Sequence, residues 1–181
     1  MLALAKVEQL RQESAPPLIR LDEILRAVAL EISPLIAQRN LDFGIHTEPA
    51  SVQAHEWMLR ELCRNLLHNA VRHAPPGTEL AVDLRADRPD VVLTISDQGP
   101  GIDEELATRL FQPFSAGDVR AGSGLGLAIC QEIVKAVGGS IALANRVEDH
   151  GISGLDAVVR LPLDAPPDDR HSQALAAQSA P

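Results

Sequence analysis

Two asparagines one helical turn apart, Asn65 and Asn69, are the first residues of this 181-residue sequence whose type and spacing suggest a chemical task. Residues 56–73 have the spacing of an amphipathic helix. Asn forms helices less readily than the Glu, Lys and Gln that usually fill a solvated face, whereas its side-chain oxygen suits Mg²⁺. The polar face is therefore either an ordinary solvated surface or a set of metal ligands. Its residues fall within an arc of about 100°: Glu61, Asn65, His68, Asn69 and Arg72.

A second motif, Asp97-Gln98-Gly99-Pro100-Gly101, follows an expected strand over residues 91–95. A carboxylate at the end of a strand is held in place and can accept a hydrogen bond from an exocyclic amine such as that of adenine. Gly99 and Gly101 allow a tight turn and the close approach of a flat ring. The same residue types also make ordinary turns, so this motif alone does not separate a base-binding site from a loop.

A third motif, Gly122-Ser123-Gly124-Leu125-Gly126-Leu127, opens an expected helix over residues 125–137. Backbone N–H groups exposed at a helix start favour anions, so the segment suits a phosphate group. It is not a Walker A loop, because no Gly-Lys-Ser/Thr follows, and its spacing differs from the dinucleotide fingerprint. The alternative is a flexible loop followed by a glycine-capped helix.

Together, the three motifs supply metal ligands, a carboxylate that could recognise a base, and a phosphate-binding helix start. These are the components of a site for Mg-ATP. Each motif has an ordinary structural explanation when it stands alone, and their combination in one domain favours the nucleotide site.

The elements that must position these motifs mix helices and strands without regular alternation. Pro34 is expected to kink or interrupt the first helix, and Asp87-Arg88-Pro89-Asp90 is expected to turn a hairpin. This mixture favours the α+β class, as a two-layer α/β sandwich with helices packed on one face of a mixed sheet. Helices are expected over residues 21–38, 56–73 and 125–137, and strands over residues 41–46, 80–84, 91–95, 141–144 and 157–161.

Composition excludes several classes of function. The net charge of −9 disfavours binding to nucleic acid and to anionic lipid surfaces. Cys63 and Cys130 lie in apolar helical patterns, which predicts buried, unpaired thiols rather than metal ligands. No apolar stretch reaches the roughly 18 residues that a membrane span requires, so direct membrane insertion of this chain is not expected.

The ordered motifs resemble the ATP-binding domain of sensor histidine kinases, in the superfamily shared with DNA gyrase and the heat-shock chaperone ATPases. Residues 61–70 resemble the asparagine box of that family, and residues 97–101 resemble its first glycine box. Phe111-Gln112-Pro113-Phe114 resembles the phenylalanine box, and residues 122–129 resemble the second glycine box. Order and spacing agree over roughly residues 21–163.

This resemblance implies the Bergerat fold, a mobile ATP lid between Phe111 and Gly124, and ATP and Mg²⁺ as cofactors. Asn69, helped by Asn65, would hold Mg²⁺, and Asp97 would bind adenine. No residue is assigned as a catalytic base; Glu61 is a candidate, with a structural salt bridge as its alternative role. The implied nucleotide-binding residues are Asn65, Asn69, Arg72, His73, Asp97, Gly99, Gly101, Ile102, Gly122, Ser123, Gly124, Leu125, Gly126 and Leu127.

The sequence departs from the family pattern at two places. His73 stands where an aromatic side chain commonly stacks near the adenine. Gly154-Leu155-Asp156-Ala157 stands where the family usually has small residues and threonine, so no nucleotide contact is assigned to the last strand. In the lid, Asp118 and Arg120 are candidates to orient the triphosphate or a partner helix.

The partner that the resemblance implies is a dimerisation domain bearing the phosphoacceptor histidine. In the family that histidine has a neighbouring acid and a proline five residues on, and none of the six histidines here fits; His55 is followed by Glu56 but has Arg60 at the proline position. The chain is therefore expected to be part of a longer, cytoplasmically exposed kinase anchored in the inner membrane, which serves a response regulator indirectly. Residues 1–16 would end the phosphoacceptor helix and form a linker, residues 17–163 would form the ATP-binding domain, and residues 164–181 a disordered tail.

Three other functions were compared with this one. An ATP-hydrolysing clamp, as in gyrase and the chaperones, uses a glutamate one turn before the metal-binding asparagine, where this chain has Asn65. An anti-sigma-type serine kinase shares the site, but the helical segment of residues 1–14 argues against it. A module that has lost nucleotide binding is disfavoured by the intact Asn65, Asn69 and Asp97.

Overall fold

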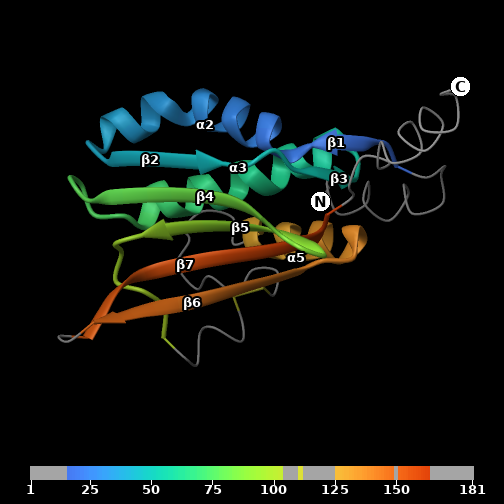
Figure 1. The fold of residues 1–181 in the computed structure, drawn as a ribbon. Helices are drawn as coiled ribbons and strands as arrows, with labels where there is room; N and C mark the ends of the chain where they lie inside the picture. The colour runs from blue at the N-terminus through green and yellow to red at the C-terminus, as the bar shows by residue number, and fades with distance from the viewer. Residues whose placement is uncertain (1–15, 104–109, 112–124, 149–150, 164–181) are drawn as a thin grey trace, which may run out of the picture.

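A computed structural model describes residues 16–103, 110–111, 125–148 and 151–163 of the chain. It has two layers, a five-stranded mixed sheet with helices on one face (Figure 1), as the sequence predicted. The predicted helical segment of residues 1–14, the tail of residues 164–181, and the lid apart from Phe111 lie outside the described residues. The helices are α2 (Leu21–Gln38), α3 (Glu56–His73) and α5 (Gly126–Val137). The strands are β1 (Leu18–Arg20), β2 (Asp42–Thr47), β3 (Ser51–Gln53), β4 (Glu79–Asp87), β5 (Asp90–Asp97), β6 (Ser140–Glu148) and β7 (Gly151–Pro162).

The large sheet has the order β2-β4-β5-β7-β6 and places β5 at its centre. Strands β2 and β4 pair in parallel, and the other neighbours pair antiparallel. Asp87 opposes Asp90 across the predicted hairpin, which is confirmed. Along β5 the residues alternate between buried and half-buried, as in a strand with only one face covered. The covered face runs to the end of β5, so the residues that follow enter the space beneath the helices.

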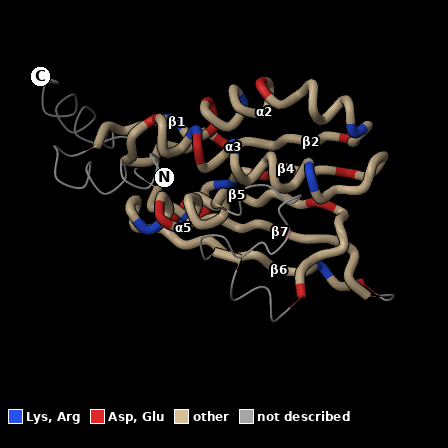
Figure 2. The backbone as a smooth tube through the Cα atoms, turned by 180° about the vertical axis from the view of Figure 1, so that it is seen from behind, with Lys and Arg blue, Asp and Glu red and all other residues tan. Residues whose placement is uncertain are grey.

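Helix α3 is central to the helical layer, because it contacts α2, α5 and β5. Seen from the opposite side, the helices lie in front of the sheet and carry charges of both signs (Figure 2). The apolar side of α3, which includes Leu59, Leu62 and Leu66, is buried against the sheet and its neighbouring helices. Cys63 and Cys130 are buried and unpaired as predicted, and burial raises the pKa of Cys63 to about 12. Both thiols therefore act as small apolar side chains.

Helix α2 continues through Pro34, so the predicted interruption is wrong. Proline lacks the N–H group that would bond to the carbonyl of Leu30. The hydroxyl of Ser33 donates to that carbonyl instead, at 2.8 Å. This side-chain bond replaces the missing backbone bond and lets the helix run on. No helix in the described part of the chain has both the length and the apolar character that crossing a bilayer demands.

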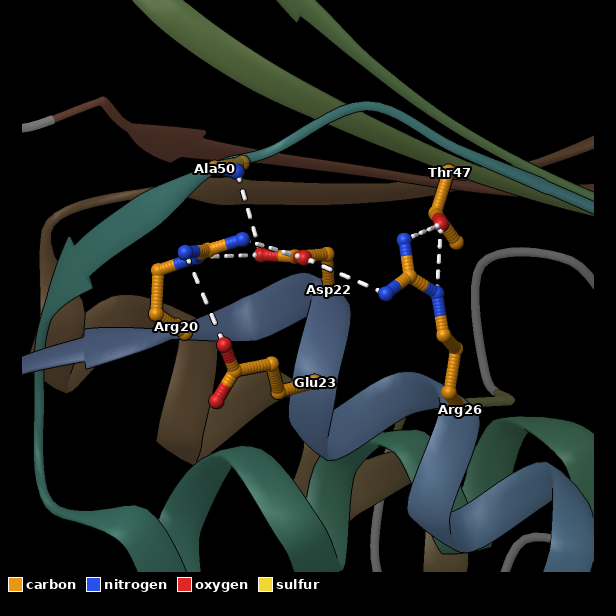
Figure 3. A network of polar contacts seen from close by, with 6 residues as sticks. All are labelled: Arg20, Asp22, Glu23, Arg26, Thr47 and Ala50. Carbon is orange, nitrogen blue, oxygen red and sulfur yellow. Dashed lines mark hydrogen bonds and ion pairs between the residues drawn. The ribbon is translucent and has the colours of Figure 1, made fainter.

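A small second sheet, β1 paired with β3, was not predicted. It places the start of α2 beside the segment that precedes α3, and a network around Asp22 fixes this junction (Figure 3). Asp22 is fully buried and accepts bonds from Arg20 Nε and Nη2 at 2.8 and 2.7 Å and from the Ala50 N–H at 3.2 Å. Arg26 lies 3.7 Å from the same carboxylate and also donates to Thr47. The carboxylate thereby joins the start of α2 to β1 and to the residue that precedes β3.

We predict that Asp22→Asn lowers the free energy of unfolding by about 2 kcal/mol at pH 7, because the charge-assisted bonds to Arg20 are lost. Burial raises the pKa of Asp22, but the bonds from Arg20 and Ala50 outweigh it and hold the pKa below its ordinary value. The stabilisation is therefore present above about pH 4 and is lost as the pH falls further. Urea unfolding followed by the fluorescence of the single tryptophan, Trp57, measures the effect.

The matched control is Asp87→Asn, which removes an exposed ion pair to Arg160 and should cost less than about 0.5 kcal/mol. Equal losses in the two variants would contradict a structural role for the buried network.

Candidate functional site

A cavity of about 180 Å³ lies between α3, the end of β5 and the neighbouring strands. It is smaller than the roughly 300–1,000 Å³ of pockets for drug-sized ligands, so it suits a single flat ring system. Its polar lining side chains are Asn69, His73 and Asp97. Its other lining residues are Leu66, Ala70, Ile95, Pro100, Gly101, Ile102, Leu110, Leu127, Leu143, Leu155 and Ala157. The site is thus an apolar slot with one acidic group.

Asp97 supplies that acidic group, and its side chain is only half satisfied. It is 4% exposed, and its Oδ1 accepts a 2.7 Å bond from the Gly99 N–H. Within the described part of the chain, Oδ2 has no hydrogen-bond partner. Burial raises the pKa of Asp97, although the Gly99 N–H, His73 and Arg146 act in the opposite direction. A poorly solvated carboxylate is unfavourable, so a ligand that supplies an amine at Oδ2 would be selected.

The two glycines of this loop are sterically required. A Cβ on Gly99 would lie 2.7 Å from Asp97 Oδ1 and 2.9 Å from the backbone oxygen of His73. Gly101 has a φ of +72°, and a Cβ there would lie 2.5 Å from Asn145 Oδ1. Other atoms of the protein therefore already exclude a side chain at both glycines, whether or not a ring enters the cavity.

The asparagine row on α3 is half-buried, so a plain solvated face does not describe it. Asn65 Nδ2 donates to both the backbone oxygen and the carboxylate of Glu61, each at 3.0 Å. These bonds leave Asn65 Oδ1 free to face the start of α5, where a Cβ on Gly126 would lie 3.1 Å from it. Asn69 lines the cavity, whereas His68 is exposed. Among the described residues Glu61 forms no ion pair and accepts the bond from Asn65 instead, so its salt-bridge role stays a prediction.

A second hollow, of about 230 Å³, lies between α2 and α3 and meets the first at Asn69. Arg39, His68 and Arg72 line it. Arg72 therefore lies on the far side of Asn69 from the apolar slot. A ligand whose ring fills the slot would have its charged end near Asn69, with this basic side chain close by.

His73 lines the apolar slot as predicted. The residue is exposed at its outer side, but partial burial lowers its pKa and the charge of Arg72 lowers it further, so the imidazole is mainly neutral at pH 7. A neutral ring can lie against a base without placing a cation beside it.

The third motif is described only in part. Leu127 lines the slot, and Gly126 is the first residue of α5. Gly122, Ser123 and Gly124 lie outside the described residues, as do Asp118 and Arg120. The phosphate-binding role of this segment therefore stays a prediction.

Sequence reasoning missed the contribution of the last two strands. Leu143 of β6 and Leu155 and Ala157 of β7 line the slot, although no contact was assigned to the last strand. The physical reason is that successive side chains of a strand point to opposite faces. Leu155 and Ala157 therefore face the slot, while Asp156 faces away and pairs with Arg146. The apolar alternation Ile141, Leu143 on β6 was the signal that could have identified this wall.

The fold and site agree with known proteins. Residues 54–165 match the family described as histidine kinase-, DNA gyrase B- and HSP90-like ATPase, and the chain belongs to this family. Its relatives within the family are sensor kinases, which confirms the resemblance that the motifs indicated. The chain is 41% identical over 101 residues to sensor protein BasS of Salmonella typhimurium, a match that covers 55% of this chain and 28% of BasS. It is 31% identical over 164 residues to sensor protein QseC of Salmonella typhi, covering 88% of this chain and 35% of QseC.

Solved structures show the same relationship. The catalytic domain of histidine kinase ThkA superposes with a TM-score of 0.73 at 28% identity, covering 81% of this chain and 94% of that chain. The match thus extends over nearly all of the ThkA catalytic domain. It spans only about a third of the sensor proteins BasS and QseC, at 28% and 35% of their lengths.

We predict that Asp97→Asn leaves the free chain at least as stable as the wild type at pH 7. Asn keeps the size of the side chain and the acceptor for the Gly99 N–H, and it removes a charge that burial disfavours. The pKa of Asp97 is higher in the folded chain than in the unfolded chain, so the wild type loses stability as the pH rises from the unfolded pKa through the folded one. Below about pH 3 the carboxyl is protonated in both states, and the advantage of the variant should vanish. Urea unfolding at the two pH values tests this. A clear loss of stability at pH 7 would show that Asp97 supports the fold rather than a ligand.

Proposed function

We propose that this chain binds Mg-ATP and presents the γ-phosphate to a histidine on a separate phosphoacceptor and dimerisation domain. The observation that carries the proposal is the Asp97 carboxylate in an apolar slot of ring size, whose Oδ2 has no hydrogen-bond partner among the described residues. Membership of the histidine kinase-like ATPase family supports the same ligand and reaction class.

The adenine would occupy the slot, with its 6-amine donating to Asp97 Oδ2. Leu66, Ile95 and Leu155 would pack against the ring, and His73 would lie at its edge. Apolar walls exclude water from the carboxylate, which strengthens the bond to the amine. A base without that amine would leave the carboxylate unpaired and would bind weakly.

The phosphates would extend past Asn69 toward the start of α5. Asn65 and Asn69 offer two neutral amide oxygens there, and the described residues contain no group of three or more His, Cys, Asp or Glu side chains that could hold a metal ion. This donor set fits Mg²⁺, which commonly binds to few protein ligands and completes its coordination with phosphates and water. When bound, Mg²⁺ would neutralise phosphate charge, and Arg72 and the α5 amides would add to this effect.

Transfer would depend on positioning, since the described residues supply no assigned nucleophile or base. Glu61 holds the amide of Asn65, which orients the free oxygen of that side chain. The accepting histidine would lie on the partner domain, and a response regulator would receive the phosphate from it. The parent kinase would be anchored in the inner membrane, with this domain on the cytoplasmic side.

We predict that the chain incubated with γ-labelled ATP remains unlabelled alone and labels a separately prepared phosphoacceptor domain. Asp97→Asn should abolish this labelling, because the adenine loses its acceptor, whereas Asp87→Asn on the same strand pair should retain it. Labelling of the chain itself, or full labelling of the acceptor by Asp97→Asn, would contradict the proposal.

We also predict that Asn69→Ala removes most of the Mg²⁺-dependent gain in ATP affinity. The variant should bind ATP in the presence of Mg²⁺ at least about tenfold more weakly than the wild type, a loss of about 1.4 kcal/mol. Its affinity for adenosine, which carries no phosphate, should change little. Calorimetry with and without Mg²⁺ measures both, and an equal loss for ATP and adenosine would assign Asn69 to the base instead.

A further inference from the structure

Strand β6 contacts the loop of Asp97 through two consecutive side chains, Asn145 and Arg146. Asn145 Oδ1 accepts a 2.8 Å bond from the Ile102 N–H. Its Nδ2 donates to the Ile102 backbone oxygen at 2.7 Å. One amide group therefore satisfies both polar groups of a single loop residue, as a paired strand would.

Arg146 holds the other end of the same loop. Its Nη2 donates to the backbone oxygen of Asp97 at 2.7 Å, and its Nη1 pairs with Asp156 on β7. A Cβ on Gly154 would lie 2.1 Å from that Asp97 oxygen and 2.4 Å from Arg146 Nη2. Glycine at residue 154 thus keeps the path of the guanidinium open.

The two side chains reach the loop from opposite faces of the sheet. Asn145 opposes Leu155, which lines the apolar slot, and Arg146 opposes Gly154. Arg146 lines a separate polar groove with Ser96 and Gln98. Consecutive strand residues point to opposite faces, so one dipeptide grips both ends of residues 97–102.

We propose that Asn145 and Arg146 are positioning residues for base recognition, which fix the direction of the free Asp97 oxygen. The inference rests on the proposed function. Within the described part of the chain, the Asp97 side chain is bonded only to the Gly99 N–H of its own loop. The loop therefore determines where Oδ2 points, and Asn145 and Arg146 bond to the backbone at its two ends. Neither residue needs to touch the nucleotide.

A more mobile Asp97 loop would weaken the hydrogen bond from the adenine amine more than the other contacts with the nucleotide. The apolar walls and the phosphate contacts would remain, whereas the bond from the adenine amine needs a carboxylate in a fixed place. We call Asn145 and Arg146 the clamp. Removing either side chain should thus reduce discrimination between ATP and ITP, which has a carbonyl where ATP has the amine.

The test is calorimetry of Asn145→Ala and Arg146→Gln with ATP and with ITP. We expect the wild type to bind ATP more tightly than ITP. In each variant the ratio of the two affinities should fall about tenfold, through weaker ATP binding, while the affinity for ITP stays nearly unchanged. The matched controls are Ser153→Ala, on the same hairpin, and Arg160→Gln, which removes an exposed arginine of β7. Both controls should keep the wild-type preference.

Hydrogen exchange of the nucleotide-free chain gives a second readout. The Ile102 amide should exchange much faster in Asn145→Ala, while the Leu93 amide in β5 stays protected. Equal weakening of ATP and ITP, or an unchanged Ile102 amide, would overturn the clamp alone. A wild type without any preference for ATP would overturn the proposed function as well.

Discussion

The buried Asp97 carboxylate, with one oxygen bonded inside its own loop and the other without a partner among the described residues, is the constraint on which the proposed site depends. An ionised group in an apolar slot is unfavourable for the free chain, and its pKa is raised accordingly. Such a group is useful only if a ligand donates to it, and its isolation then gives selectivity. The surrounding fold holds this carboxylate in a position that is shielded from water.

Three parts of the fold meet that requirement. The centre of the sheet carries β5, so Asp97 emerges beneath α3 rather than at an edge. Helix α3 provides both the apolar roof, through Leu66, and the asparagine row beside it. Strand β6 reaches back to the loop through Asn145 and Arg146. The slot, the asparagine row and the side chains that hold the Asp97 loop thereby come from elements far apart in the sequence.

The helices were predictable because their apolar spacing is long and regular: residues 21–38 and 56–73 are helical as predicted. The last strand was predicted as residues 157–161 but spans Gly151–Pro162, because Gly154 and Asp156 break its apolar alternation. The three-residue strands β1 and β3 are too short to show a period. Asp97 and Asn69, which line the slot, were predicted as site residues from residue type and order. Asn145 contacts the backbone of Ile102, 43 residues away, and leaves no local pattern.

The most direct measurement is a nuclear magnetic resonance titration of the Asp97 carboxyl carbon with adenosine and with purine riboside, which has the same ring system without the 6-amine. If Asp97 recognises the amine, adenosine will shift the carboxyl signal and the Gly99 amide to saturation. Purine riboside at the same concentrations will leave both nearly unchanged. Equal binding of the two nucleosides, or shifts confined to the hollow lined by Arg39 and His68, would contradict the account.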